Sequence, residues 1–343
     1  MKTFNYTPYN SQFELCPVKL LTGKLYYEGC EKPLYILGNP TGDWGDSLAI
    51  VEMKKDRWPM PNRLELRYAT KDTGKCYAID TPLDVERAEE LWEAQEEEYP
   101  DAPFIHYVVG TAPHGGVAIW LRGDDRSVLL HWFQAPEVSL TKDEQQFLKR
   151  AEIENEVEFI TSEQLQKDMQ QFEYRYEVLE ECFEDYEWKL YDEEDLYFDD
   201  IDIDSVEDKR TDGTFQYLEN DSLMKYHTAG KPLRISVRWH EGRSDYFAHY
   251  WINNFGITHF LDTFFKVTGE KRVTIMLRLD IRNNWFALAL KGESPQFRPL
   301  PIPSNAYQVI VFEDDEECFR SRNFHQEPGD WNWLKSDPVT KEE

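Results

Sequence analysis

The chain has 343 residues, of which 41% are hydrophobic and 15% aromatic, so it can bury a core as one large or two ordinary domains. Its 38 basic and 66 acidic residues give a formal net charge of −28 at pH 7, which excludes non-specific binding to nucleic acid or anionic lipid, because both need clustered Lys and Arg. Five scattered cysteines without a Cys-x-x-Cys pair indicate neither a disulfide framework nor a zinc site, and they suit a reducing compartment.

We expect strands in the N-terminal region and no export signal. Residues 13–52 are expected to form strands around the segment FELCPVKLLTGKLYY, with loop signals at NPTGDWGDS. No apolar stretch of signal-peptide length is visible, and no run in the chain approaches the roughly 20 apolar residues of a membrane span. We therefore expect a cytoplasmic protein that does not insert into a membrane.

Two stretches of the chain, residues 61–133 and 232–297, repeat the same order of features. Two landmarks occur in the same order in both, with offsets of 171 and 169 residues. Because the offsets differ by only two residues, the pattern suggests an internal duplication. The matched landmarks are Arg67-Tyr68 with Arg238-Trp239, and Leu121-Arg122-Gly123 with Leu290-Lys291-Gly292.

Each copy is expected to run strand, strand, helix, strand, strand. From Leu64 to Tyr68, apolar residues alternate with charged ones as on a half-buried strand. The helix that follows has one apolar and one acidic face, and we expect burial of Trp92 in the first copy and of Phe264 or Phe265 in the second. The short turns indicate antiparallel pairing, so the predicted class is α+β and β-rich, with two tandem modules separated by an acidic insert.

Charge distinguishes a central insert, residues 136–210, from a β-rich N-terminal domain, residues 1–135, and a β-rich C-terminal domain, residues 211–343. The insert holds 8 basic and 26 acidic residues, a net charge of −18, whereas the flanking domains carry −7 and −3. Two capping-box patterns in the insert predict helix starts, Thr141-x-x-Glu144 and Thr161-x-x-Gln164.

Aromatic residues are interleaved with the acidic residues near the end of the insert. Disordered acidic segments usually lack aromatics, whereas protein-recognition surfaces combine aromatic anchors with charge that steers the partner. The alternative is a solvated acidic loop whose aromatics pack on the adjacent domain. The residues of the predicted partner-binding site are Glu180, Glu184, Tyr186, Trp188, Tyr191, Asp192, Asp195, Tyr197 and Asp199.

No motif in the sequence predicts a catalytic, cofactor or metal site. Asp200, Asp202 and Asp204 are spaced as at the start of an EF-hand loop. That loop needs Gly at its sixth position and Glu at its twelfth, where this chain has Ser205 and Thr211. The HGG stretch lacks an accompanying GxSxG nucleophile elbow, and GNPTGDWGD lacks the lysine of a phosphate loop. We expect a protein that is not an enzyme and has no cofactor.

The N-terminal domain resembles a bacterial family of unknown function, DUF2931. The residues that carry the resemblance are Trp44-Gly45, Pro61 to Tyr68, Tyr77, Val85 to Trp92, and Gly110 to Gly123. His114 is inserted into the family's A-P-G-G stretch. These are turn and core residues, so the resemblance implies a shared fold and no catalytic residue. It also implies a role in antagonism between bacteria, of the immunity type.

The expected function is therefore that of a binding protein that neutralises a toxin by covering a cationic surface. Its partner is then a protein, encoded by a neighbouring gene, and not a nucleic acid. The alternative is a module for a small, glycan-type ligand that stacks on exposed aromatics such as Trp331 and Trp333.

Overall fold

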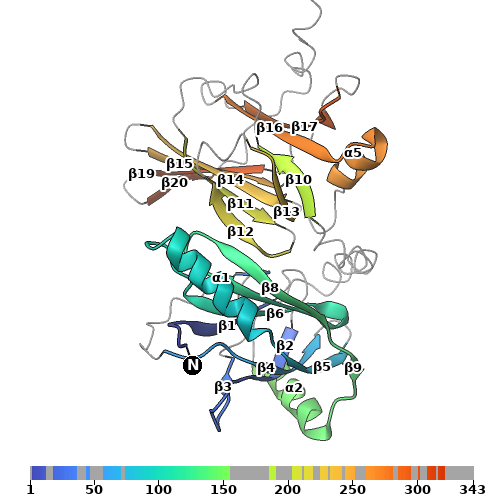
Figure 1. Ribbon diagram of the computed structural model, residues 1–343. Helices are drawn as coiled ribbons and strands as arrows, with labels where there is room; N and C mark the ends of the chain where they lie inside the picture. The colour runs from blue at the N-terminus through green and yellow to red at the C-terminus, as the bar shows by residue number, and fades with distance from the viewer. Residues whose placement is uncertain are drawn as a thin grey trace, which may run out of the picture. The chain divides into compact units, whose positions relative to one another are not determined.

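The fold consists mainly of β-strands, arranged in sheets that are antiparallel or mixed (Figure 1). Together with the few helices, this makes the chain an α+β protein. The structure is a computed structural model, and it describes residues 2–12, 18–36, 44–46, 57–70, 74–154, 185–190, 203–210, 212–218, 225–230, 232–241, 244–251, 260–280, 285–294, 300–301, 307–313 and 316–320.

The chain divides into two compact units. The first comprises residues 1–180 and Asp212–Phe215, and the second comprises residues 181–211 and 216–343. We call Asp212–Phe215 the return segment, because it belongs to the first unit while the chain on both sides of it belongs to the second. This division differs from the three expected domains, since residues 181–210 of the expected insert are part of the second unit.

The described strands of the first unit form two sheets. Their bounds are β1 (Thr7–Gln12), β2 (Val18–Tyr26), β3 (Leu34–Tyr35), β4 (Arg63–Thr70), β5 (Cys76–Pro82), β6 (His106–Thr111), β7 (Gly116–Arg122), β8 (Ser127–Gln134) and β9 (Glu137–Val138). The strand orders are β1-β6-β7-β8 and β3-β2-β4-β5-β9. The β1–β6 pair is parallel, and the other described pairs of this unit are antiparallel.

Both sheets contribute to one hydrophobic core. On β4, Leu64, Leu66 and Tyr68 are buried while Glu65 and Arg67 between them are half-buried, which confirms the predicted alternation. Helix α1 (Val85–Glu98) adds Trp92 to the same core. The helix begins where the Asp84 carboxylate accepts a hydrogen bond of 3.0 Å from the Arg87 amide, as an N-cap does.

Helix α2 (Lys142–Glu154) begins at the first predicted capping box. The Thr141 amide donates to Oε2 of Glu144 at 2.7 Å, and the Glu144 amide donates to the Thr141 hydroxyl at 3.2 Å. Two amides that lack partners at a helix start are thereby satisfied, and this prediction is confirmed. The second predicted capping box, at Thr161, lies outside the described residues.

The second unit also contains two sheets among its described strands. The bounds are β10 (Asp185–Lys189), β11 (Ile203–Arg210), β12 (Phe215–Leu218), β13 (His227–Gly230), β14 (Pro232–Glu241), β15 (Ser244–Trp251), α5 (Phe260–Thr268), β16 (Arg272–Asp280), β17 (Trp285–Lys291), β18 (Leu300–Pro301), β19 (Tyr307–Glu313) and β20 (Glu316–Arg320). The strand orders are β13-β10-β16-β17-β18 and β12-β11-β14-β15-β19-β20.

Two strand pairs of each unit have the same relative directions. β1 pairs in parallel with β6, as β10 does with β16, and β2 pairs antiparallel with β4, as β11 does with β14. The order hairpin, helix, hairpin also recurs, as β4-β5-α1-β6-β7 and β14-β15-α5-β16-β17. Trp92 and Phe264 are 1% and 2% exposed, so the predicted burial of both residues is confirmed.

Candidate functional site

The structure describes two residues of the predicted partner-binding site, Tyr186 and Trp188, both on β10. Tyr186 is half-buried, and its ring stacks on that of Phe265 at 5.2 Å between centroids. The remaining predicted residues lie outside the described part of the chain, namely Glu180, Glu184, Tyr191, Asp192, Asp195, Tyr197 and Asp199, as do Trp331 and Trp333 of the alternative ligand site.

Trp188 is a core residue, which corrects its prediction as an exposed anchor. Its side chain is 0% exposed, and its indole N–H donates to the Gly230 carbonyl at 3.3 Å. The ring also lies 4.0 Å from that of His227, centroid to centroid. β10 is an inner strand of its sheet, between β13 and β16, and both of these contacts of the Trp188 side chain are to residues of β13. Trp188 therefore fits the alternative prediction, in which the aromatic residues of the insert contribute to packing and not to a partner surface.

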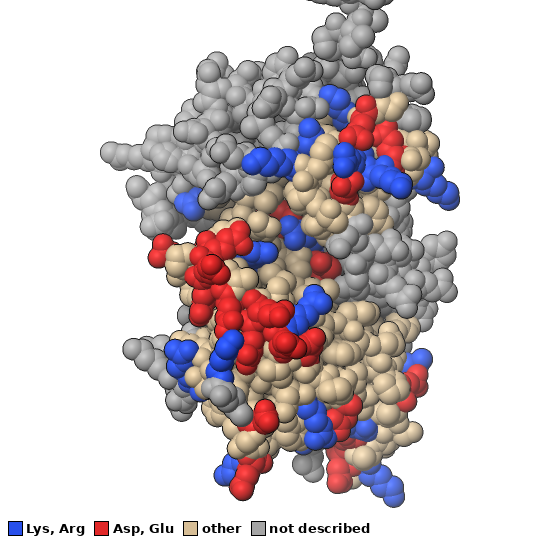
Figure 2. All heavy atoms as spheres, in the orientation of Figure 1, with Lys and Arg blue, Asp and Glu red and all other residues tan. Residues whose placement is uncertain are grey.

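The described surface that best suits a binding role is the outward face of α1. Seven of its 14 residues are Glu, and acidic side chains gather over this helix (Figure 2). We call the six exposed ones the α1 acidic face: Glu86, Glu90, Glu93, Glu96, Glu97 and Glu98. The sequence prediction missed this surface because acidic residues on the outer side of a helix are ordinarily a solvated face. The feature of the sequence that could have identified this surface is the density of glutamates between Val85 and Glu98.

Few basic groups balance the α1 acidic face. Lys2 lies 2.6 Å from Glu93 and 3.8 Å from the neighbouring Glu89, and this pairing raises the pKa of the Lys2 ammonium. Arg87 is exposed on the same helix. At the end of the helix, the partly exposed Tyr99 ring lies 5.9 Å from the Arg126 guanidinium and adds an aromatic side chain beside the carboxylates.

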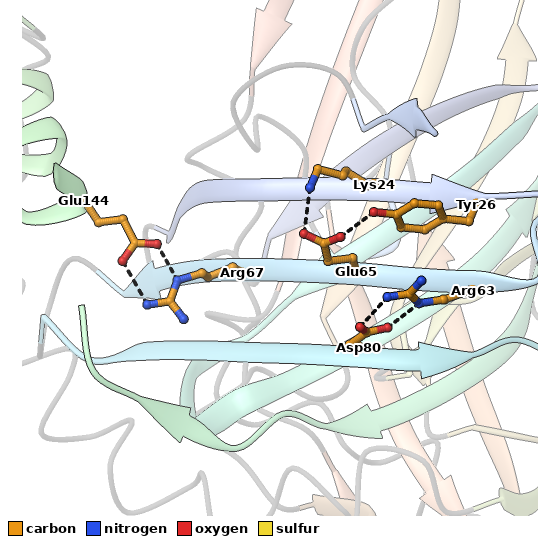
Figure 3. A network of polar contacts seen from close by, with 7 residues as sticks. All are labelled: Lys24, Tyr26, Arg63, Glu65, Arg67, Asp80 and Glu144. Atoms are coloured by element: carbon orange, nitrogen blue, oxygen red, sulfur yellow. Dashed lines mark hydrogen bonds and ion pairs between the residues drawn. The ribbon is translucent and has the colours of Figure 1, made fainter. Parts of the chain in front are cut away.

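A second polar surface lies on the outward face of β2, β4 and β5 (Figure 3). The Lys24 ammonium donates to Glu65 at 2.7 Å, and the Tyr26 hydroxyl donates to the other oxygen of the same carboxylate. These two hydrogen bonds lower the pKa of Glu65. Arg63 makes two hydrogen bonds of 2.5 Å each to Asp80, an arrangement that lowers the pKa of Asp80.

The same surface is tied to α2 by an ion pair. Arg67 on β4 binds both oxygens of Glu144, one of them at 2.9 Å, and donates to the Ser139 carbonyl at 2.7 Å (Figure 3). The hydrogen bond from Arg67 is the main reason that the pKa of Glu144 falls to about 2. Because the charges of this network already pair with one another, the surface offers a partner less unbalanced charge than the α1 acidic face does.

The residues of the family-like motifs make structural contacts with one another. Tyr68 is completely buried, and its hydroxyl lies 2.8 Å from the carbonyl of Ala112 and 3.1 Å from that of Gly116. It thereby holds both ends of the β6–β7 connection. His114, the inserted residue, takes the left-handed conformation with φ of 54° in this turn.

A further motif contact joins Trp44 to Trp120, whose ring centroids lie 4.8 Å apart at nearly a right angle. A Cβ atom added to Gly110 would lie 2.4 Å from the Trp120 ring, so only glycine allows this approach. Arg122, at the end of the motif, pairs with Asp46 at 2.6 Å and donates to the Gly45 carbonyl at 3.2 Å. The motif residues therefore account for packing and turns, as the resemblance implied.

His106 and His131 make structural contacts. His106 is largely buried, which lowers its pKa to about 4, and its ring meets that of Tyr9 edge-on at 4.7 Å. His131 accepts a hydrogen bond of 3.2 Å from the Asp84 amide at the start of α1. Within the described residues, no three His, Cys, Asp or Glu side chains are grouped so that they could hold a metal ion. No helix in that part of the chain has the length and apolar character needed to cross a membrane.

Comparison with known proteins gives one match. A family model described as a protein of unknown function, DUF2931, matches residues 3–178. No curated protein and no solved structure matches the chain. The matched region includes both sheets of the first unit, α1 and the motif residues, and it ends before the return segment.

Proposed function

This chain belongs to the DUF2931 family of proteins of unknown function, and from that premise we propose that it is a non-enzymatic, cytoplasmic binding protein of the immunity type. Its partner is a toxin with a basic surface, and neutralisation consists of covering that surface. The resemblance to a family associated with antagonism between bacteria supports this role, as does the net charge of −28.

The α1 acidic face is the observation that carries the proposal, because the pairing of Glu93 with Lys2 and the hydrogen bond from the Trp92 indole to Glu96 account for only part of it. Glu96, Glu97 and Glu98 stand in the last turn, which has no basic residue, and the helix dipole disfavours negative charge there. Glu86 and Glu90 are four residues apart, a spacing at which like charges repel. A face that costs the helix stability is readily explained by an interaction with positive charge elsewhere.

The proposed mechanism separates attraction from anchoring. Unbalanced carboxylates accelerate the encounter with a basic partner over a range set by the ionic strength. Once in contact, an aromatic side chain that loses its hydration adds most of the binding energy. In the described region we assign this anchoring role to Tyr99, since Trp188 is buried. The carboxylates of Glu180, Glu184, Asp192, Asp195 and Asp199 stay a separate prediction, which is based on their charge in the sequence.

Duplication is the structural part of the proposal. We propose that the second unit arose as a second copy of the first, which explains why both use the same hairpin, helix, hairpin order and the same parallel pair. On this view the second copy begins at β10, before the position expected from the landmarks. An experimental structure of the chain tests it: corresponding strands should superpose in the same order, and a different placement of α1 and α5 on their sheets would contradict it.

The first experiment asks whether the partner exists. The chain is co-expressed with the product of its neighbouring gene, and growth and co-purification are measured. We expect that product to be toxic alone, to be harmless together with this chain, and to co-purify with it. A product that is not toxic, or that is toxic and does not bind, contradicts the proposal.

The second experiment asks whether the α1 acidic face is the contact. Glu90→Lys with Glu97→Lys reverses two exposed charges of the face, and Glu28→Lys with Glu31→Lys makes the same change in charge in an exposed loop after β2. We expect the first pair to slow association about tenfold at low salt and to weaken its salt dependence, because steering acts mainly on the association rate. Equal effects of the two pairs would mean that net charge alone matters and would contradict a specific face.

A further inference from the structure

The return segment is bound at a defined place in the first unit. The Trp120 indole N–H donates to the Asp212 carbonyl at 3.0 Å, and the Ser127 hydroxyl accepts a hydrogen bond of 2.9 Å from the Phe215 amide. The guanidinium of Arg122 lies 4.1 Å from the centre of the Phe215 ring. These contacts use both ends of the segment and three different side chains of β7 and β8.

The segment has a turn conformation that its own residues stabilise. The Asp212 carboxylate accepts hydrogen bonds from the Thr214 amide at 2.8 Å and from the Thr214 hydroxyl at 2.6 Å. Gly213 has φ of 81°, a conformation that L-residues rarely adopt. All four residues of the segment are buried, and the internal hydrogen bonds offset part of the cost of burying the Asp212 carboxylate.

Glycines on both sides allow the close approach. A Cβ atom added to Gly213 would lie 2.7 Å from the Trp120 ring, and one added to Gly45 would lie 2.0 Å from the Gly213 carbonyl oxygen. Such distances are too short for any side chain. The fit therefore depends on the backbone of one segment lying directly against the backbone and tryptophans of another.

We infer that Trp44, Gly45, Trp120, Arg122 and Ser127 form a binding site for a short turn peptide of the type Asp-Gly-Thr-Phe, and that the return segment is its occupant. We call these five residues the tryptophan site. The site lies within the part of the chain that the family model matches, and its occupant lies beyond that part. The first unit is consequently incomplete without a peptide from the second half of the chain. This inference does not depend on the proposed function.

The test compares glycine variants of the full chain by hydrogen–deuterium exchange. Gly213→Ala adds a Cβ atom against Trp120, whereas Gly74→Ala, in the same unit and with φ of 65°, adds one where no atom lies within 4 Å. Both substitutions place alanine at a positive φ and so introduce the same kind of backbone strain. The difference in exchange between the two variants therefore reports the contact between residue 213 and Trp120. We expect exchange in residues 212–215 and in β7 and β8 to become about tenfold faster in Gly213→Ala than in Gly74→Ala.

Phe215→Ala is the second variant, because it keeps the glycine turn and removes only the ring on Arg122. It should also raise exchange in residues 212–215 and in β7, while β14 and β15 of the second unit keep their protection. Unchanged exchange at the tryptophan site in both variants would overturn the inference. Faster exchange confined to the second unit would overturn it as well, because the segment would then serve that unit alone.

Discussion

Helices α1 and α5 hold the same place in the element order of the two units, yet their compositions differ. α1 has 14 residues, seven of them Glu, whereas α5 has nine residues with the sequence FLDTFFKVT. Each nevertheless buries one large aromatic side chain, Trp92 or Phe264. The two helices share the burial of one large aromatic residue, whereas the density of glutamates is a feature of α1 alone. A function of the first unit is therefore best sought on the α1 acidic face.

The largest expected effect concerns the shared core contact. Trp92→Ala removes a ring that lies 5.5 Å from that of Phe4 and 5.7 Å from that of Phe104, and it should lower the free energy of unfolding by about 3–5 kcal/mol. Phe264→Ala should cost an amount in the same range in the second unit. Urea denaturation measures both losses. A loss below about 1 kcal/mol for either residue would contradict the view that both helices are anchored to their units by one buried aromatic residue.

Trp188→Ala should have a comparable effect on the second unit. The completely buried indole leaves a cavity and an unpaired Gly230 carbonyl, so we expect a loss of about 3–5 kcal/mol in urea denaturation. Tyr186→Ala, on the same strand and half-buried, should cost less. If the melting temperature is unchanged and the partner dissociates faster, Trp188 is part of a binding surface and the assignment to the core is wrong.

Tyr68→Phe tests whether the motif tyrosine supports the turn of the first unit. The change leaves the ring in place and removes the hydroxyl that donates to the Ala112 and Gly116 carbonyls, so we expect a loss of about 1–3 kcal/mol. Tyr35→Phe, at a tyrosine that is 60% exposed, is the matched control and should be neutral. Equal stabilities of the two variants would show that the buried hydroxyl contributes nothing.

Glu144→Gln should lower stability by about 1 kcal/mol at neutral pH, since the Glu144 side chain is 19% exposed and bound by both nitrogens of the Arg67 fork. The pKa of Glu144 falls from 4.5 to about 2, so the pairing stabilises the fold above pH 4.5 and is lost as the pH falls towards 2. The difference between wild type and variant should shrink over that window. A difference that stays constant with pH would assign the effect to something other than the charge.

The smallest expected effect is that of Glu90→Lys with Glu97→Lys on stability. Both side chains are exposed, and the change relieves repulsion on α1, so the free energy of unfolding should stay within about 0.5 kcal/mol of its value in the wild type. A thermal melt measures this. A clear loss would show that Glu90 or Glu97 makes ordered contacts within the unit, as Glu93 does with Lys2, which would weaken the assignment of this face to a partner.

The sequence by itself determined the elements whose signals are local. Alternation from Leu64 to Tyr68 predicts β4, and the first capping box predicts the start of α2, because both depend on residues a few positions apart. The spacing of apolar residues around Trp92 likewise predicts which face of α1 is buried. Residues that repeat with the period of a strand or helix carry this information without reference to the rest of the chain.

Only the tertiary structure decided which acidic and aromatic residues are available to a partner. Trp188 lies among charged residues and has the pattern of a surface, but it is completely buried and contacts Gly230 and His227, about 40 residues further along the chain. The return segment fills the tryptophan site through contacts about 90 residues apart in sequence. Burial and docking of this kind depend on which distant strands and side chains come together, and short-range periodicity does not encode that choice.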